Sequence, residues 1–228
     1  MKIPNVPKVH WDKFYLEVNI MGLIKFIRKR NKKYELVLND NIKVGDKTLY
    51  RIKALIDFGY GYIKAGELGG YIEKESNLSH EGNCWVSGNA KVFGDARISR
   101  NAWVFDNAKV YGNAMVYGDA EVFGDAEVYG NTKVFGNAKV FGDATICNNA
   151  YISSNDDIAL VQYFGSMNRT TTFFRTKDNS IEVKCGCFSG TLDEFKSKVK
   201  ETHGDNKYAQ QYNLAIQLIE CKFEIGGK

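Results

Sequence analysis

Proline is scarce in this chain of 228 residues, with Pro4 and Pro7 as its two examples. Histidine is scarce too, with three residues, and no stretch reaches the roughly 20 apolar residues that cross a bilayer. We therefore expect glycine and asparagine to make the turns, and no membrane span. The chain start lacks the apolar core of a signal peptide, and the five cysteines are an odd number. Both features favour a reducing, cytoplasmic location.

Negative charge is sparse near the N-terminus. The net charge of the whole chain is +4, but residues 1–64 carry fourteen Lys or Arg against six Asp or Glu. Leu16, Ile20, Leu23, Ile24 and Ile27 recur at helical spacing, so residues 1–33 are predicted to form a basic amphipathic helix. Its basic run, residues 25–33, suits the phosphates of a nucleic acid or an anionic membrane surface. A solvated helix end is the alternative.

An internal repeat dominates the middle of the chain. Residues 82–153 divide without gaps into twelve hexads, whose fifth residue is always Val or Ile. The third residue is Ala in ten hexads, with Cys84 and Thr132 as the exceptions. Strand periodicity places both positions inward. Gly at the first position and Asn or Asp at the second suit the left-handed backbone of a corner. The pattern predicts three hexads per coil and about four coils.

This pattern resembles the hexapeptide repeat of left-handed parallel β-helices, and the resemblance implies that handedness. A two-sided or right-handed solenoid is the alternative. Upstream, Ile72 and Leu78 are also six residues apart, which predicts an irregular capping coil. The segments TLYRIKAL, KAGELGGYIE and GNCWVSGNA resemble uncharacterised hexapeptide-repeat proteins encoded by phages and prophages. That resemblance implies a phage context and no particular activity.

The flanks of the repeat predict smaller units, and the expected fold class is mainly β. Residues 34–81 are expected to form a β-rich segment and cap, with turns at 39–41 and 45–46. Residues 154–228 are expected to form a small α+β domain with three strands and a hairpin turn at 178–179. Thr191 and Glu194 form a capping box that predicts a helix ending at Gly204, followed by a second helix over 207–222.

Aromatic residues recur on the outward positions of all three predicted faces. Such apolar rows favour an interface, and one face is the richest. Its members are Trp85, Trp103, Phe105, Phe123 and Phe141. We expect a homo-oligomer contact there, and the hexapeptide resemblance implies a trimer. A dimer, or docking of the terminal segments on this face, is the alternative.

A second candidate site lies after the repeat, in the segment TTTFFRTKD. Alternation along a strand places Thr171, Phe173, Arg175 and Lys177 on one side. Arg169 and Lys184 are expected nearby. Arginine binds phosphate through a planar fork, and phenylalanine offers a stacking surface. The pattern therefore predicts a site for an anionic, nucleotide-like ligand, with a solvated strand face as the alternative.

Catalytic signals are weak. Hexapeptide acyltransferases rely on a histidine and β-helical carbonic anhydrases on several, whereas the twelve hexads contain none. Cys185, Cys187, His203 and Cys221 are the one candidate zinc set, but Cys185 and Cys187 are expected in the core. We expect no catalytic residue, metal or cofactor.

The favoured function is a non-enzymatic phage binding protein that counters host defence by sequestering a nucleotide signal or a defence protein. A structural virion spacer and a hexapeptide acyltransferase are the alternatives.

Overall fold

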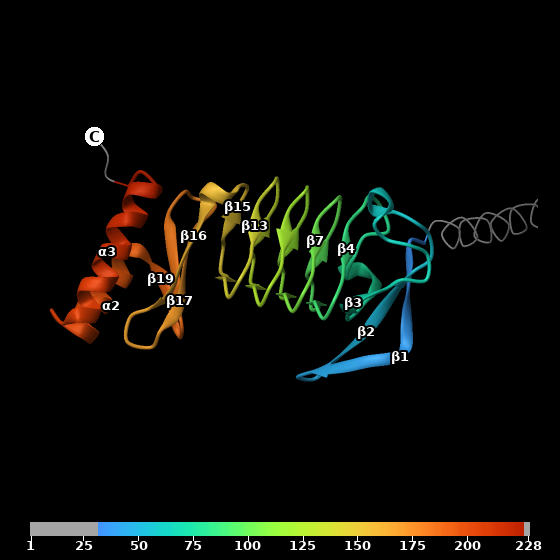
Figure 1. Ribbon diagram of the computed structural model, residues 1–228, viewed down its shortest axis with the longest axis horizontal. Coiled ribbons are helices and arrows are strands. Elements are labelled where there is room, and N and C mark those ends of the chain that lie inside the picture. Colours follow the sequence, from blue (N-terminus) through green and yellow to red (C-terminus); the bar gives the residue numbers. More distant parts are fainter. Residues whose placement is uncertain (1–31, 226–228) are drawn as a thin grey trace, which may run out of the picture.

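The computed structural model describes residues 32–225 and is mainly β. A parallel β-solenoid of about five turns forms its elongated centre (Figure 1). A β-hairpin lies at one end of the solenoid, and a small sheet with two helices lies at the other. No helix among the described residues is both long and apolar enough to span a membrane.

Twelve two-residue strands form the repeat region, one in each hexad. They are β4 (Trp85–Val86), β5 (Lys91–Val92), β6 (Arg97–Ile98), β7 (Trp103–Val104), β8 (Lys109–Val110), β9 (Met115–Val116), β10 (Glu121–Val122), β11 (Glu127–Val128), β12 (Lys133–Val134), β13 (Lys139–Val140), β14 (Thr145–Ile146) and β15 (Tyr151–Ile152). Strands that are three hexads apart pair in parallel, as Trp85 pairs with Trp103 and Lys91 with Lys109. Three hexads per coil are therefore confirmed.

The solenoid begins before the first hexad. Strand β3 (Leu68–Ile72) pairs in parallel with β5, and Leu78 forms a parallel bridge with Ile98. The predicted capping coil is confirmed, and it brings the total to about five turns, where the hexads alone predicted four. Gly69 and Gly70 of this coil are closely surrounded: a Cβ there would lie 2.5 and 2.7 Å from neighbouring atoms.

The inward positions of the hexads form one continuous core. Their third and fifth residues are all buried, including the exceptional Cys84 and Thr132. The Thr132 hydroxyl donates to the Tyr129 carbonyl oxygen at 2.6 Å, so its polar group is paired inside the core. The predicted assignment of Ala and Val or Ile to the interior is confirmed.

The corners differ from the prediction in one respect. All twelve first positions have positive φ, including Arg100, Asp106 and Asn148, which replace glycine. The Asn and Asp residues at the second position do not adopt this conformation. Their side chains instead form ladders between coils: Asn101 donates to Asp119 at 2.9 Å, for example. The two turn residue types therefore have different roles. The first residue adopts the left-handed backbone of the corner, and the side chain of the second forms hydrogen bonds between coils.

The N-terminal hairpin extends the largest sheet of the solenoid. Strands β1 (Tyr34–Val44) and β2 (Lys47–Ala54) are antiparallel, and β2 pairs with β3. The predicted turn at 45–46 is confirmed, but the turn predicted at 39–41 is wrong. An irregularity in register between Val37 and Asn41 takes its place within β1. A bulge needs the same turn-forming residue types as a loop, which explains the error. A short 3-10 turn, η1 (Gly59–Gly61), follows β2.

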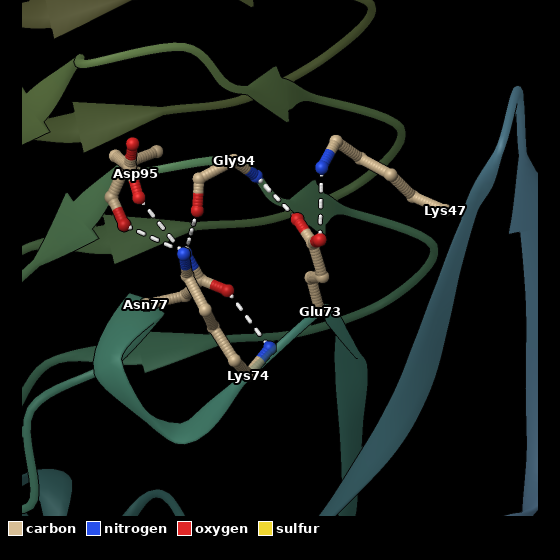
Figure 2. A network of polar contacts seen from close by, with 7 residues as sticks. Lys47, Glu73, Lys74, Asn77, Gly94 and Asp95 are labelled. Atoms are coloured by element: carbon tan, nitrogen blue, oxygen red, sulfur yellow. Dashed lines mark hydrogen bonds and ion pairs between the residues drawn. The ribbon is translucent and has the colours of Figure 1, made fainter.

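Polar contacts attach the capping coil to the first regular coil (Figure 2). Glu73 accepts from Lys47 Nζ at 2.8 Å and from the backbone N–H of Gly94 at 2.6 Å. Lys74, which precedes η2 (Glu75–Asn77), pairs with Asp95 at 2.8 Å. Asn77 is fully buried and donates to the Gly94 and Ala96 carbonyl oxygens. These contacts satisfy backbone groups that the irregular coil leaves without ladder partners.

The C-terminal segment is a four-stranded antiparallel sheet with two helices. It follows η3 (Asn155–Asp157) and contains β16 (Ile158–Phe164), β17 (Arg169–Arg175), β18 (Ile181–Cys185), β19 (Phe188–Thr191), α2 (Leu192–His203) and α3 (Lys207–Lys222). The hairpin turn at 178–179, the capping box and both helices are confirmed. Strand β19 was not predicted. It follows a tight turn at Gly186, which has φ +61°.

Candidate ligand-binding clefts

Strand β17 lies in the interior, between the end of the solenoid and the two helices. Phe173 is fully buried and packs edge-on against Phe195 of α2, with ring centroids 6.0 Å apart. On the opposite face, Phe174 belongs to the solenoid core, and Thr172 accepts a hydrogen bond from the backbone N–H of Thr145 at 3.1 Å. Both faces of the strand are therefore covered.

The predicted site on this strand is wrong for two of its residues. Thr171 and Phe173 are fully buried, and the Thr171 hydroxyl contacts Cys185 Sγ at 3.1 Å. A phenyl ring with no exposed surface cannot stack on a ligand. The strand alternates as predicted, but the side assigned to solvent faces the helices instead.

The predicted cations are divided between different surroundings. Arg175 forms an ion pair with Asp157 at 3.2 Å, donates to Asn179 at 2.6 Å and lies over the ring of Phe223. The Arg175 guanidinium therefore already has partners within the chain and is less available to a ligand. Lys177 lies in the turn after β17, whereas Arg169 and Lys184 lie together near the other end of the β17–β18 pair. Only the last two share a cleft.

The cleft around Arg169 and Lys184, here the Arg169 cleft, has a volume of about 310 Å³. Its lining consists of Asp143, Thr145, Tyr163, Asn168, Arg169, Thr170, Lys184 and Gly186. No carboxylate of residues 32–225 lies within 4.0 Å of the charged nitrogens of Arg169 or Lys184. Both cations therefore remain available for a ligand anion, with hydroxyl and amide groups beside them.

Tyr163 supplies the aromatic surface that was expected from Phe173. Its side chain is 69% exposed, and its backbone has φ +58° at the end of β16. The left-handed conformation falls at the register irregularity between Val161 and Phe164, so the strand is distorted here. Sequence reasoning missed Tyr163 because the segment reads as an uninterrupted strand. A second aromatic, Tyr60, has the same backbone feature in η1.

Arg169 also borders a smaller, more apolar hollow of about 240 Å³ beside the helices. Tyr212 and His203 line it and stack with ring centroids 5.5 Å apart. Burial, together with the neighbouring Cys185 thiol, raises the pKa of Tyr212 to about 12, so its hydroxyl stays protonated. Cys187 is exposed here, which corrects its predicted place in the core: it lies in the turn, beyond the end of β18.

A third hollow, of about 610 Å³, lies at the opposite end of the β17–β18 pair. Lys177, Lys133 and Tyr151 are part of its lining, together with Asp178 and Glu182. Thr176 donates to Asp178, and Asn148 donates to Glu182 at 2.7 Å. This hollow has two cations and two carboxylates in its lining, whereas the Arg169 cleft has two cations and the single carboxylate of Asp143, so the local charge favours anions more in the Arg169 cleft.

The N-terminal part of the chain covers one end of the predicted oligomer face. Trp85 is fully buried: Phe58 packs edge-on against it at 5.1 Å, and Tyr34 at 6.3 Å. Its prediction as an interface residue is wrong, because chain from the N-terminal part covers it. Trp103 is half-buried and packs against the solenoid core. Among the described residues of this face, Phe105 and Phe123 remain partly exposed and Phe141 is exposed.

Phe105, Phe123 and Phe141 form a continuous stack along the solenoid. Their ring centroids are 4.8 and 5.6 Å apart, and Phe141 is 46% exposed. Two other ladders stack in the same way, Phe93–Tyr111–Tyr129 and Tyr117–Phe135. Offset stacking of this kind preserves the spacing of the coils and leaves one edge of each ring outward.

The basic run at 25–33 lies mostly outside the described residues. Of its last two cations, Lys32 pairs with Glu75, and Lys33 is buried. Neither contributes a free surface charge. The nucleic-acid prediction for residues 25–31 therefore stays a prediction.

Within residues 32–225, no group of three or more His, Cys, Asp or Glu side chains has the arrangement of a metal site. Comparison with protein-family models gives no match to this chain, and neither does comparison with curated proteins. The proposed function therefore rests on the geometry of the clefts.

Proposed function

We propose that this protein is a non-enzymatic binding protein that captures a small anionic ligand of the nucleotide class in the Arg169 cleft. The observation that carries the proposal is the pairing of Arg169 and Lys184 in one cleft without a carboxylate within 4.0 Å among the described residues. Tyr163 offers a face for a base, and Thr145, Asn168 and Thr170 offer hydrogen bonds to a sugar. Charge-assisted hydrogen bonds are about twice as strong as neutral ones, so a phosphate is the favoured anion.

The biological context of the proposal comes from the phage resemblance of the repeat region. A phage protein that sequesters a nucleotide in the host cytoplasm would remove an immune signal, and a host defence protein is the second target that we propose. Oligomers formed through the phenylalanine stack, trimers above all, would present several clefts at once. Multiple clefts raise the amount of ligand that each particle holds.

The test is retention and binding of nucleotides by the purified full chain. We expect heat denaturation to release a compound with nucleobase absorbance, and calorimetry with mono-, di- and cyclic nucleotides to identify the preferred class. Arg169→Ala and Lys184→Ala should each weaken binding about tenfold or more, since a hydrogen bond to a charged group contributes about 1.5–3 kcal/mol. Lys177→Ala, in the charge-balanced hollow, is the matched control.

The alternatives have separate outcomes. Acyl-CoA binding and turnover would favour the acyltransferase. Absence of any nucleotide binding, together with incorporation into virions, would favour the structural spacer. Capture of one defined host protein without nucleotide would keep the counter-defence role and reject the ligand class. Equal binding by the wild type and Arg169→Ala would reject the cleft.

A further inference from the structure

Lys33 and Cys84 meet at the closed N-terminal end of the solenoid core. Lys33 is 2% exposed and Cys84 is fully buried. Lys33 Nζ donates to the carbonyl oxygens of Cys84 at 2.8 Å and Gly82 at 3.2 Å, and lies 3.3 Å from Cys84 Sγ. The Lys33 nitrogen is thus held against the sulfur by two fixed backbone acceptors.

The surroundings of Lys33 make its ammonium group easier to deprotonate. No carboxylate of residues 32–225 lies within 4.0 Å of Lys33 Nζ, and the Phe58 ring centroid is 5.0 Å away. Burial lowers the pKa of Lys33 although the neighbouring Cys84 acts in the opposite direction, and burial raises the pKa of Cys84. A neutral amine carries the lone pair that a charged ammonium lacks.

Packing alone does not require a thiol at this position. Cys84 occupies the third place of its hexad, where ten of the twelve hexads carry Ala. Alanine is therefore the residue that the repeat accepts at this site. Cys147, which is also buried, lies 3.6 Å from Ser189 Oγ and contacts the Tyr129 hydroxyl, and no lysine of residues 32–225 forms a hydrogen bond with it. The Lys33–Cys84 pair is specific to the first hexad.

We propose that Lys33 and Cys84 form a covalent nitrogen–oxygen–sulfur bridge when the protein is oxidised by hydrogen peroxide. One peroxide oxidises the thiol to a sulfenic acid, and a second converts the amine to a hydroxylamine; each step releases one water. The hydroxylamine oxygen then attacks the sulfenic sulfur, and the sulfenic oxygen leaves as a third water. The two-electron oxidation of nitrogen and that of sulfur together consume both peroxides.

The bridge would join two points that are 51 residues apart in sequence. It would lock residue 33, the end of the basic run, onto the first hexad and close the solenoid end covalently. The unfolded chain would then contain a long closed loop, which lowers its entropy. Oxidation is therefore expected to raise the thermal midpoint of the wild type.

The test is peptide mapping of the full chain before and after hydrogen peroxide. We expect a linked pair of peptides containing Lys33 and Cys84, heavier than their sum by one oxygen and lighter by two hydrogens, and separated again by a thiol reductant. Cys84→Ala introduces the residue that ten other hexads carry at this position, so the variant should fold normally, give no linked pair and show no rise in thermal midpoint. Cys147 serves as an internal control that should not link to lysine.

Three outcomes would overturn the proposal. They are oxidation of Cys84 to sulfenic or sulfinic acid with Lys33 unmodified, an unreacted Cys84, and the same rise in thermal midpoint in Cys84→Ala. Lys33→Met separates the bridge from simple thiol chemistry: its Cys84 should oxidise without linking. Should that variant fail to fold, the peptide map of the wild type alone decides.

Discussion

At the scale of single residues, the corners of the solenoid determine how closely successive coils approach. Gly82 has φ +69°, and a Cβ there would lie 2.3 Å from the carbonyl oxygen of Arg100 in the next coil. Gly45, in the turn between β1 and β2, has φ +59° and no atom within 4 Å of a Cβ. The two glycines share a conformation and differ in their neighbours.

This pair separates conformational strain from coil contact. Gly45→Ala should cost about 1–2 kcal/mol, the penalty of a left-handed residue with a Cβ. Gly82→Ala should cost clearly more, because the backbone of the next coil must also move. Midpoints of chemical denaturation for both variants measure the difference. Equal losses would show that the corners do not limit coil stacking.

A partly buried carboxylate, Asp157, links the stability of the C-terminal sheet to pH. Burial opposes ionisation of Asp157, but hydrogen bonds from Ser153 and Ser154 and the charge of Arg175 prevail and hold its pKa below the ordinary value. A lowered folded-state pKa gives stability that is present above the unfolded pKa of about 3.9 and is lost as the pH falls through the folded pKa.

Asp157→Asn should therefore destabilise the protein by about 1.5–3 kcal/mol at neutral pH, the contribution of hydrogen bonds to a charged group. The difference from the wild type should shrink below pH 4, as the wild-type carboxyl becomes protonated. Unfolding curves across this range provide the measurement, with the exposed neighbour Asp156→Asn as control. A difference that is constant with pH would assign the effect to packing rather than charge.

At the scale of elements, the capping coil shows how an irregular sequence joins a regular repeat. Asn77 precedes Leu78, which pairs with Ile98 of the next coil, and the Asn77 amide donates to the Gly94 and Ala96 carbonyl oxygens. Its Oδ1 accepts from the backbone N–H of Lys74 at 2.9 Å. One side chain thus serves three backbone groups (Figure 2).

Asn77→Ala should destabilise the capping coil by about 2 kcal/mol or more, because it removes three hydrogen bonds and leaves buried carbonyl oxygens unpaired. Backbone amides of β3 should exchange faster while those of β10–β13 keep their protection. Ser76→Ala, an exposed change in the same turn, should alter stability by no more than about 0.5 kcal/mol. Uniform loss of protection along the solenoid would mean that the cap and the coils unfold as one unit.

The elements also show what could be predicted from sequence. The hexads repeat one local environment twelve times, so a strand and a corner follow from each. Strand β17 has no such redundancy. Its adjacent Phe173 and Phe174 face different cores, one against the helices and one against the solenoid. Alternation predicts that they face apart, but only the docking of the sheet on the last coil shows that both sides are covered.

At the scale of the whole molecule, contacts between distant parts of the chain explain the wrong prediction for Trp85. Trp85 reads as an outward residue because its hexad is regular, and the chain that buries it lies upstream in Phe58 and Tyr34. Long-range contacts of this kind leave no periodic signal. Because Trp85 is covered, the exposed part of the predicted interface is shorter than the sequence indicated and consists mainly of the stack of Phe105, Phe123 and Phe141.

Association through that stack should be lost when its rings are removed. In the proposed oligomer, each chain would bury Phe105, Phe123 and Phe141 against a partner, and a fully buried Phe side chain contributes about 1.5–3 kcal/mol. The triple change of these residues to Ser should convert a multiple of 25.7 kDa into the single chain mass, measured by native mass spectrometry.

The control for association is a matching ladder on another face. Tyr117 and Phe135 stack at 5.1 Å, so changing both to Ser removes similar stacking within the chain without touching the proposed contact. That variant should keep the oligomer mass, and circular dichroism should show that both variants fold. A wild type of 25.7 kDa would reject the oligomer, and loss of association in the control alone would move the interface to the face that carries Tyr117 and Phe135. Ring stacking within the chain is similar in both ladders. A difference in association between the two variants would therefore show which face contacts the partner.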